Sequence, residues 1–262
     1  MKIGIIGGGN LGSSLARGLL KSGALKAEEI IVSDPDERRL KELENLGTKT
    51  TTDNRKLVKD CDVVFIAIKH GIMGTVLKEV EDISNDKLFV SMAAGVPIKF
   101  IEAHTKARVI RVMPNICGAV AEMASCFSLG RRATPNDGEL VERLLGSMGA
   151  TFKVEEKLID AVTGVSGSGP AYFYLFIKAL QEVGVELGLS SEVALKLAAQ
   201  TAKGAGEMLL ATDGSLDDLI KQVCTPKGTT IEAIKVLENR KVAEAIKDAV
   251  KADVKRAKEL SG

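Results

Sequence analysis

The sequence is poor in aromatic residues and has no excess of either charge. Aromatic residues make up 3% of the 262 residues, and tryptophan is absent. The 36 lysines and arginines against 35 aspartates and glutamates leave a formal net charge of +1. Binding to nucleic acid or to an anionic membrane needs a basic field, and single-stranded nucleic acid also needs aromatic stacking platforms. We therefore expect neither nucleic acid nor a membrane as a partner.

Closely spaced metal ligands are also missing. The two histidines and four cysteines include no Cys-x-x-Cys pair, so no metal site is expected. The N-terminus lacks the pattern of a secretory signal, and the apolar run 170–177 is too short to span a bilayer. These absences predict a reduced, cytoplasmic, enzyme-like protein. The cysteines are Cys61, Cys117, Cys126 and Cys224.

Short β-branched runs alternate with amphipathic stretches through the first half of the chain. Most of these runs are apolar on both faces, which is typical of buried parallel strands. The alternation predicts an α/β fold with a doubly wound parallel sheet. The expected strands are 3–6, 30–33, 63–68, 88–91, 109–112, 126–129 and 151–154. The expected helices are 10–22, 36–46, 71–80 and 136–149.

The strand patterns stop near residue 155, and long helical patterns follow. The segment 171–187 is apolar nearly all round, and a helix of this kind must be covered on several sides. The second half is too short to provide that cover by itself. We therefore predict two domains, 1–154 and 155–262, of which the second is all-helical and forms a homodimer. A compact monomeric bundle is the alternative.

A glycine-rich turn follows the first expected strand and opens a helix. Residues 7–12 read Gly-Gly-Gly-Asn-Leu-Gly and match the G-x-G-x-x-G pattern in its required context. Gly7 permits the tight turn, Gly9 lets a pyrophosphate approach the backbone, and Gly12 lets the helix pack against the strand. The alternative is a glycine-rich turn without a ligand. The expected phosphate-binding residues are Gly7, Gly9, Asn10, Leu11 and Gly12.

The end of the second expected strand bears on the choice of dinucleotide. Asp34 follows Gly12 by about 20 residues, where a carboxylate suits the ribose 2′-hydroxyl of NAD(H). An arginine in the same region can instead hold the 2′-phosphate of NADP(H), and Arg38 and Arg39 lie nearby. These arginines could equally form an exposed helix face. The residues alone therefore leave NAD(H) and NADP(H) open.

Three more segments end or follow expected strands. They are 67–70, 93–95 and 113–115. Ligands of an open parallel sheet bind beyond the carboxyl ends of its strands, so these segments are predicted to line the nicotinamide side.

Two stretches of the second half are rich in small and hydroxyl-bearing residues. Residues 164–172 read Gly-Val-Ser-Gly-Ser-Gly-Pro-Ala-Tyr. The part 164–170 is predicted to form a turn, with Pro170 in the first turn of the next helix. Residues 223–232 read Val-Cys-Thr-Pro-Lys-Gly-Thr-Thr-Ile-Glu and precede a helix that begins near Thr229. Their N–H groups and hydroxyls predict a carboxylate-binding nest, and a simple Ser/Thr helix cap is the alternative.

Together with Ala-Ala-Gln-Thr at 198–201, these stretches resemble pyrroline-5-carboxylate reductase, and the resemblance covers essentially the whole chain. The element Thr-Pro-x-Gly-Thr-Thr-Ile-x-Ala, at 225–233, is highly specific to that family. The family reduces Δ1-pyrroline-5-carboxylate to L-proline with NAD(P)H, in the last step of proline biosynthesis. The resemblance implies a Rossmann domain, a helical dimerisation domain, NADP(H) or NAD(H) as cofactor, and a homodimer that in many relatives assembles further into a decamer.

The resemblance also assigns roles to individual residues. It places the hydroxyl of Thr230 beside the substrate ring nitrogen as the catalytic group. The implied substrate-binding residues are Thr225, Gly228, Thr229 and Thr230. Asn54 matches a position near the adenosine end of the cofactor. Ala67, Lys69, Ala93 and Asn115 match cofactor-lining positions. Independently of the resemblance, Asp34, Arg38 and Ile68 are expected to bind the cofactor because they lie at or near the strand ends.

The sequence departs from the family pattern at three places. His70 replaces a usual proline, Ile116-Cys117 replaces a usual Thr-Pro, and Lys227 replaces a usual glycine. His70 is expected to be a polar loop residue. Lys227 either attracts a carboxylate or points into solvent, and it would be strained if its position required a positive φ.

Other functions are less well supported by the sequence. A β-hydroxyacid dehydrogenase shares the two-domain plan but has a catalytic lysine where this chain has Phe173, and a ketone needs such an acid. A non-catalytic NAD(P)-binding dimer would not need the residues 225–230. Reduction of a related cyclic imine stays open, because a small pocket discriminates weakly against one methylene.

Overall fold

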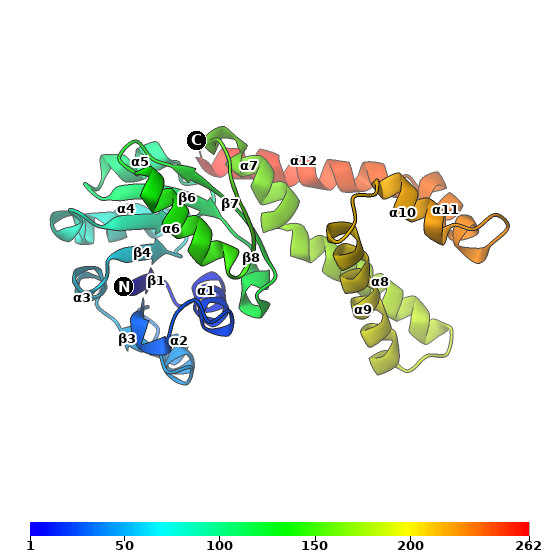
Figure 1. Ribbon diagram of the computed structural model, residues 1–262, viewed down its shortest axis with the longest axis horizontal. Coiled ribbons are helices and arrows are strands. Elements are labelled where there is room, and N and C mark those ends of the chain that lie inside the picture. The colour runs from blue at the N-terminus through cyan, green and yellow to red at the C-terminus, as the bar shows by residue number, and fades with distance from the viewer. Residues whose placement is uncertain (262) are drawn as a thin grey trace. The chain divides into compact units, whose positions relative to one another are not determined.

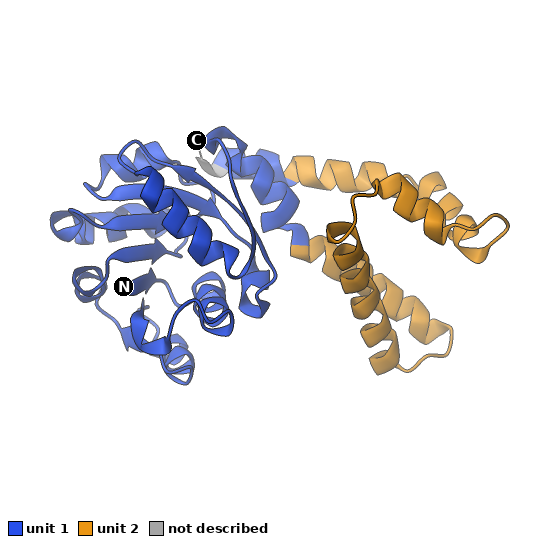
Figure 2. Cartoon of the chain, in the orientation of Figure 1, with its two compact units in different colours: residues 1–169, 253–262 blue, residues 170–252 orange. Residues whose placement is uncertain are grey.

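The computed structural model describes residues 1–261 and separates the chain into two compact units (Figure 2). The sheet unit comprises residues 1–169 and the C-terminal residues from 253 onward, and the helical unit comprises residues 170–252. The chain thus passes between the units twice. The predicted domain boundary after residue 154 directly follows the last strand and remains a prediction.

The sheet unit is built on an eight-stranded sheet with the order β3-β2-β1-β4-β5-β6-β7-β8 (Figure 1). All neighbouring pairs are parallel except β6 and β7, which confirms the predicted doubly wound α/β class. The strands are β1 (Ile3–Ile6), β2 (Ile30–Ser33), β3 (Lys49–Thr51), β4 (Val63–Ile66), β5 (Leu88–Ser91), β6 (Arg108–Met113), β7 (Met123–Leu129) and β8 (Gly149–Lys153).

Two features of the sheet differ from the predicted pattern. The sheet is not wholly parallel, because Met113 of β6 pairs with Cys126 of an antiparallel β7. The connection 114–122 is too short for the crossover that a parallel pair requires. The edge strand β3 is also unpredicted, because its Lys-Thr-Thr sequence gives no apolar run.

Helices cover both faces of the sheet, and each face has its own core. On one face Leu19 of α1 and Leu144 of α6 pack in one cluster, and on the other Leu57 of α3 and Leu77 of α4 pack in a second. The sequence pattern predicts neither α3 nor α5, since both are too short for a clear helical period. The helices are α1 (Asn10–Lys21), α2 (Glu37–Glu44), α3 (Asn54–Asp60), α4 (His70–Glu79), α5 (Ile98–Ala103) and α6 (Pro135–Gly146).

Residues 164–170, which the sequence predicts to form a turn, are helical except for Ser168. Helix α7 (Ile159–Val162) continues as a π-helix (Thr163–Gly167). After Ser168, α8 (Gly169–Glu186) begins. Glycine suggests a turn because its helix propensity is low. Here its missing side chain permits close packing on β6, since a Cβ at Gly167 would lie 3.2 Å from the sulfur of Met113. Pro170 lies in the first turn of α8, as predicted.

The helical unit contains most of α8 and the first part of α12. Its helices, including these two, are α8 (Gly169–Glu186), α9 (Ser191–Leu210), α10 (Leu216–Val223), α11 (Thr229–Asn239) and α12 (Val242–Ser261). Leu175 and Leu210 are 69% and 84% exposed, and several other large apolar side chains are similarly open. The buried residues within 170–252 are Pro170, Ala194 and Ala198. A single helical unit therefore has almost no core of its own.

Candidate functional site

The glycine turn is formed by backbone packing that excludes side chains. Gly7 has a φ of +105° and lies against β4, where a Cβ would be 2.5 Å from the carbonyl oxygen of Ala67. A Cβ at Gly12 would lie only 1.8 Å from the carbonyl oxygen of Gly7. Gly9 is the N-cap of α1 and no side chain caps that helix. The free N–H groups at this helix start fit the pyrophosphate of a dinucleotide.

Sheet register brings the expected cofactor segments to one edge. The N–H of Gly7 donates to the carbonyl of Ser33 at 2.7 Å, and that of Ala67 donates to Ile6 at 2.8 Å. The N–H of Met92 in turn donates to Ile66 at 3.0 Å. The ends of β2, β1, β4 and β5 are therefore held side by side, as expected for parallel strands.

Asp34 is turned inward at the end of β2. Its side chain is buried, with Oδ2 accepting the N–H of Gly8 at 2.8 Å and Oδ1 accepting the N–H of Asp36 at 2.8 Å. Arg39 Nη1 also lies 3.4 Å from Oδ2. Both carboxylate oxygens are therefore engaged within the protein. Gly8 occupies the first x of G-x-G-x-x-G, so the pattern gives no sign that its N–H holds Asp34.

Arg38 is paired with the cap of its own helix. Its Nε and Nη2 donate to the two carboxylate oxygens of Asp36, each at 3.1 Å, and its side chain is 92% exposed. Hydrogen bonds from the side chain and backbone of Arg38 lower the pKa of Asp36, and the same pair raises the pKa of Arg38. Both groups are charged at neutral pH.

Asn54 lies beside the end of β2, at the start of α3. Its Oδ1 accepts the Ser33 hydroxyl at 2.7 Å, and its Nδ2 donates to Glu79 Oε2 at 2.9 Å. The structure therefore places Asn54 next to the expected adenosine-binding residues.

The segments after β4 and β5 lead into the same edge of the sheet. Ala67 and Ile68 are half-buried, Lys69 is the N-cap of α4, and Ala93 is buried. His70, expected in a loop, is instead the exposed first residue of α4.

Asn115 connects β6 to two neighbouring segments. Its Oδ1 accepts the N–H of Cys117 at 3.2 Å, and its Nδ2 donates to the carbonyl of Ser166 at 3.1 Å. The side chain thus holds the start of the 3-10 helix η3 (Ile116–Val120) and the π-helix together. Sequence reasoning gives no signal for the partner Ser166, because it lies far along the chain.

Ile116 and Cys117, which replace a usual Thr-Pro of the family, lie where η3 packs on α1. The Ser14 hydroxyl donates to the carbonyl of Ile116 at 2.9 Å, and a Cβ at Gly18 would lie 2.3 Å from the carbonyl oxygen of Gly118. Ser14 and Gly18 therefore fix this segment, although neither is a predicted site residue.

Residues 225–230, which we call the threonine turn, lead into α11 in the helical unit. Gly228 is the N-cap of that helix, and no side chain caps it, so the threonines are not a simple helix cap. The N–H of Gly228 donates to the carbonyl of Thr225 at 2.9 Å, and a Cβ at Gly228 would lie 2.5 Å from the Thr225 hydroxyl oxygen. Thr230 is half-buried, and Thr229 is exposed. Uncapped N–H groups beside hydroxyls suit a carboxylate.

Lys227 has a φ of +62°, so the strain that a positive φ would cause is present. We expect Lys227→Gly to raise the stability by up to about 1 kcal/mol, because glycine adopts this conformation without a Cβ penalty. Thermal melting at equal protein concentration measures the effect. The matched control Lys41→Gly, in the middle of α2, should lower stability by about 1 kcal/mol. A destabilised Lys227→Gly variant would show that contacts of the lysine outweigh its strain.

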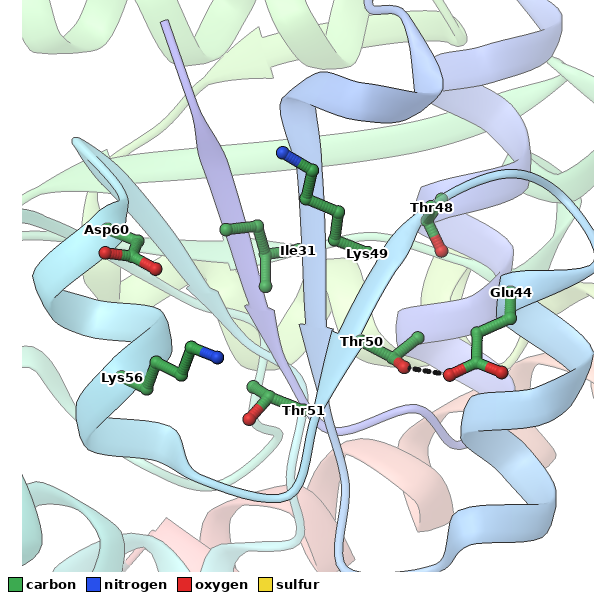
Figure 3. A pocket seen from close by; sticks show the side chains of 8 residues that line it. All are labelled: Ile31, Glu44, Thr48, Lys49, Thr50, Thr51, Lys56 and Asp60. Carbon is green, nitrogen blue, oxygen red and sulfur yellow. Dashed lines mark hydrogen bonds between the residues drawn. The ribbon is translucent and has the colours of Figure 1, made fainter.

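A cavity of about 430 Å³ lies elsewhere, at the open edge of the sheet beside β3 (Figure 3). The hydroxyl of Thr50 donates to Glu44 Oε1 at its rim. None of the expected site residues lines this cavity. The residues that line it are Ile31, Glu44, Thr48, Lys49, Thr50, Thr51, Lys56 and Asp60.

Possible metal ligands and three of the four cysteines can be described from their surroundings. Residues 1–261 hold no group of three His, Cys, Asp or Glu side chains placed for a metal ion. Burial raises the pKa of the Cys61 thiol to about 12 and also raises the pKa of Cys117 and Cys126. These three thiols are therefore protonated at neutral pH. Within the same residues, no helix has the length and apolar character needed to cross a membrane.

Comparisons with known proteins agree with this geometry over the full chain. Residues 156–260 match the family described as pyrroline-5-carboxylate reductase dimerisation, and residues 2–95 match NADP oxidoreductase, coenzyme F420-dependent. The chain is 40% identical to a pyrroline-5-carboxylate reductase of Methanosarcina acetivorans, covering 99% of this chain and 97% of the relative. The chain belongs to the pyrroline-5-carboxylate reductase family. Another relative, from Arabidopsis thaliana, is 39% identical over 99% of this chain and 95% of its own length.

Solved structures of pyrroline-5-carboxylate reductases share the whole fold. Plasmodium falciparum pyrroline carboxylate reductase, solved with NADP bound, has a TM-score of 0.92 and 30% identity, covering 100% of this chain and 98% of that chain. Family membership confirms the predicted NAD(P)H-dependent oxidoreductase class and the dimerisation domain. The start of α1, which no side chain caps and where the nearest atom to a Cβ on Gly9 would be Arg39 Nη1 at 3.8 Å, fits the NADP(H) that the family uses.

Proposed function

We propose that this protein reduces Δ1-pyrroline-5-carboxylate to L-proline with NADPH, in the last step of proline biosynthesis. Identity of about 40% to curated pyrroline-5-carboxylate reductases across 99% of the chain carries this proposal. Phe173 stands where a β-hydroxyacid dehydrogenase has its catalytic lysine, and its ring cannot donate a proton to a ketone.

In this proposal the sheet unit binds the cofactor. NADPH supplies a hydride when bound, and the protein supplies its position. The N–H groups at the start of α1 hold the pyrophosphate beside Gly9. Asn54 borders the adenosine end, and Ala67, Ile68, Lys69 and Ala93 border the nicotinamide end. Asn115 fixes the segments after β6 that complete this edge.

The threonine turn binds the substrate in the same proposal. The N–H groups and hydroxyls of Thr229 and Thr230 hold the substrate carboxylate, with Thr225 and Gly228 shaping the turn. The Thr230 hydroxyl also hydrogen-bonds the ring nitrogen and orients its proton. A cyclic imine can be protonated by water before it binds, so the reaction does not need a strong protein acid.

The proposal predicts a specific pattern of turnover. NADPH should be oxidised when Δ1-pyrroline-5-carboxylate is added, with L-proline as the product, because both binding turns are intact. Absorbance at the reduced nicotinamide band and amino-acid analysis measure the reaction. As a control, NADP⁺ with 3-hydroxyacids should give no reduction. Turnover of 3-hydroxyacids, or no proline from the imine with NADPH or NADH, would contradict the proposal.

We further propose that two copies pair through the helical unit. The exposed apolar side chains of α8 support this pairing, because a lone helical unit would present them to water. Assembly of such dimers into a decamer, the use of NADH as a second reductant, and a cytoplasmic location remain predictions from the family resemblance. Reduction of related cyclic imines is a further possible activity of the same turn.

A further inference from the structure

The inward orientation of Asp34 bears on which dinucleotide this reductase prefers. We infer that Arg39 binds the 2′-phosphate of NADPH and that Asp34 is a positioning residue that aims Arg39 and holds the glycine turn. This inference rests on the proposed function, because it concerns the cofactor of the same reaction. It assigns the phosphate contact to Arg39 in place of Arg38.

Asp34 is poorly placed to receive ribose hydroxyls. The side chain is only 5% exposed, and each carboxylate oxygen already accepts a backbone N–H, from Gly8 and from Asp36, at 2.8 Å. A carboxylate that selects NAD(H) has to point its oxygens toward the ribose. Here the two N–H groups and Arg39 also compensate the negative charge of Asp34, which reduces its repulsion of a phosphate.

Arg39 lies where a 2′-phosphate would be recognised. It projects from the first turn of α2, and its Nη1 is 3.4 Å from Asp34 Oδ2. The same Nη1 lies 3.8 Å from the position that a Cβ on Gly9 would occupy, so the guanidinium borders the glycine turn. The side chain is 54% exposed and remains accessible to a ligand. Its Nε also lies 3.8 Å from Asp36 Oδ2, so two carboxylates hold the guanidinium. Its remaining N–H groups can still be presented to phosphate oxygens.

Arg38 has a different environment. Its Nε and Nη2 both donate to Asp36, whose carboxylate also accepts the N–H of Arg38 as the cap of α2. The pairing is bidentate and engages the Nε–Nη2 edge of the Arg38 guanidinium within its own helix turn. With its side chain 92% exposed, Arg38 is also well screened by solvent.

Adenosine fragments test the inference without the substrate and without turnover. 2′,5′-ADP carries the 2′-phosphate, and 5′-AMP lacks it, so calorimetric Kd values for both isolate this contact. Arg39→Gln should weaken 2′,5′-ADP binding about 10- to 100-fold, as expected for the loss of charge-assisted hydrogen bonds. Binding of 5′-AMP should change less than about twofold. The matched control Arg38→Gln should change both Kd values less than about twofold.

A substitution at Asp34 separates positioning from direct ribose binding. Asp34→Asn should weaken the binding of both fragments, because its amide cannot accept both the Gly8 and the Asp36 N–H groups. If Asp34 instead bound the ribose, removing its charge would weaken 5′-AMP binding and strengthen 2′,5′-ADP binding. That result would overturn the positioning role.

Two results would overturn the role of Arg39. One is an equal loss of both fragments in Arg39→Gln, and the other is selective loss of 2′,5′-ADP in Arg38→Gln. Circular dichroism of each variant verifies that the fold is retained. These Kd values do not depend on the imine substrate, so wild-type turnover in the reductase assay tests the proposed function separately.

Discussion

Gly12→Ala should abolish useful NADPH binding and strongly destabilise the sheet unit. The new Cβ would lie 1.8 Å from the carbonyl oxygen of Gly7, which is backbone and cannot rotate away. Helix α1 would have to shift from the turn that precedes it. We expect NADPH affinity to fall about 100-fold or more, and stability to fall by about 3 kcal/mol. Calorimetric titration and thermal melting at equal protein concentration measure the two effects.

Gly146→Ala is the matched control for this substitution. Gly146 ends α6 and is exposed, and a Cβ at this position would meet no atom within 4 Å outside its own stretch of helix. Its replacement should leave NADPH binding unchanged and should not lower stability, because alanine favours helix. If Gly12→Ala kept its affinity within about threefold of the wild type, the close approach of α1 to the turn would not matter for the cofactor.

Thr230→Val should lower kcat/KM for Δ1-pyrroline-5-carboxylate roughly 100-fold, a loss typical for one hydrogen bond at a reacting centre. Valine keeps the shape of threonine but has no hydroxyl to bond the ring nitrogen. Because Thr230 is half-buried at the uncapped start of α11, the exchange should leave the helix in place. Steady-state kinetics with saturating NADPH measure the loss.

Two variants make the kinetic test specific. Thr230→Ser keeps a hydroxyl and should recover most of the rate. Thr212→Val removes a hydroxyl that donates to the carbonyl of Met208, near the end of α9 and outside the expected site residues, and should be as active as the wild type. Unchanged kcat and KM in Thr230→Val would remove Thr230 from the mechanism.

Local sequence patterns were sufficient to predict the elements that position the cofactor. Gly7, Gly9 and Gly12 have the spacing of a dinucleotide-binding turn, and β1 and α1 flank them as that pattern requires. The start of α11 at Thr229 also agrees with its prediction. Such features depend on neighbouring residues, so they can be recognised within a short window.

Features that depend on distant packing could not be predicted in the same way. The inward turn of Asp34 requires the N–H of Gly8, which lies on another strand end. The π-helix stands in place of an expected turn, and its Gly167 packs on Met113 of β6. A polar edge strand such as β3 leaves no periodic signal at all. These contacts exist only once the sheet has formed.

The scarcity of buried side chains in residues 170–252 has a consequence for how this chain tolerates change. Leucines such as Leu175 are exposed within one subunit, so in the proposed dimer their shape would be constrained by a neighbouring copy rather than by their own chain. A substitution in α8 would then occur in both copies of the dimer, so symmetry would double its effect on dimer stability. Compensating changes would have to suit both copies at once. We therefore predict that the sequence changes more slowly at these leucines than at ordinary exposed leucines.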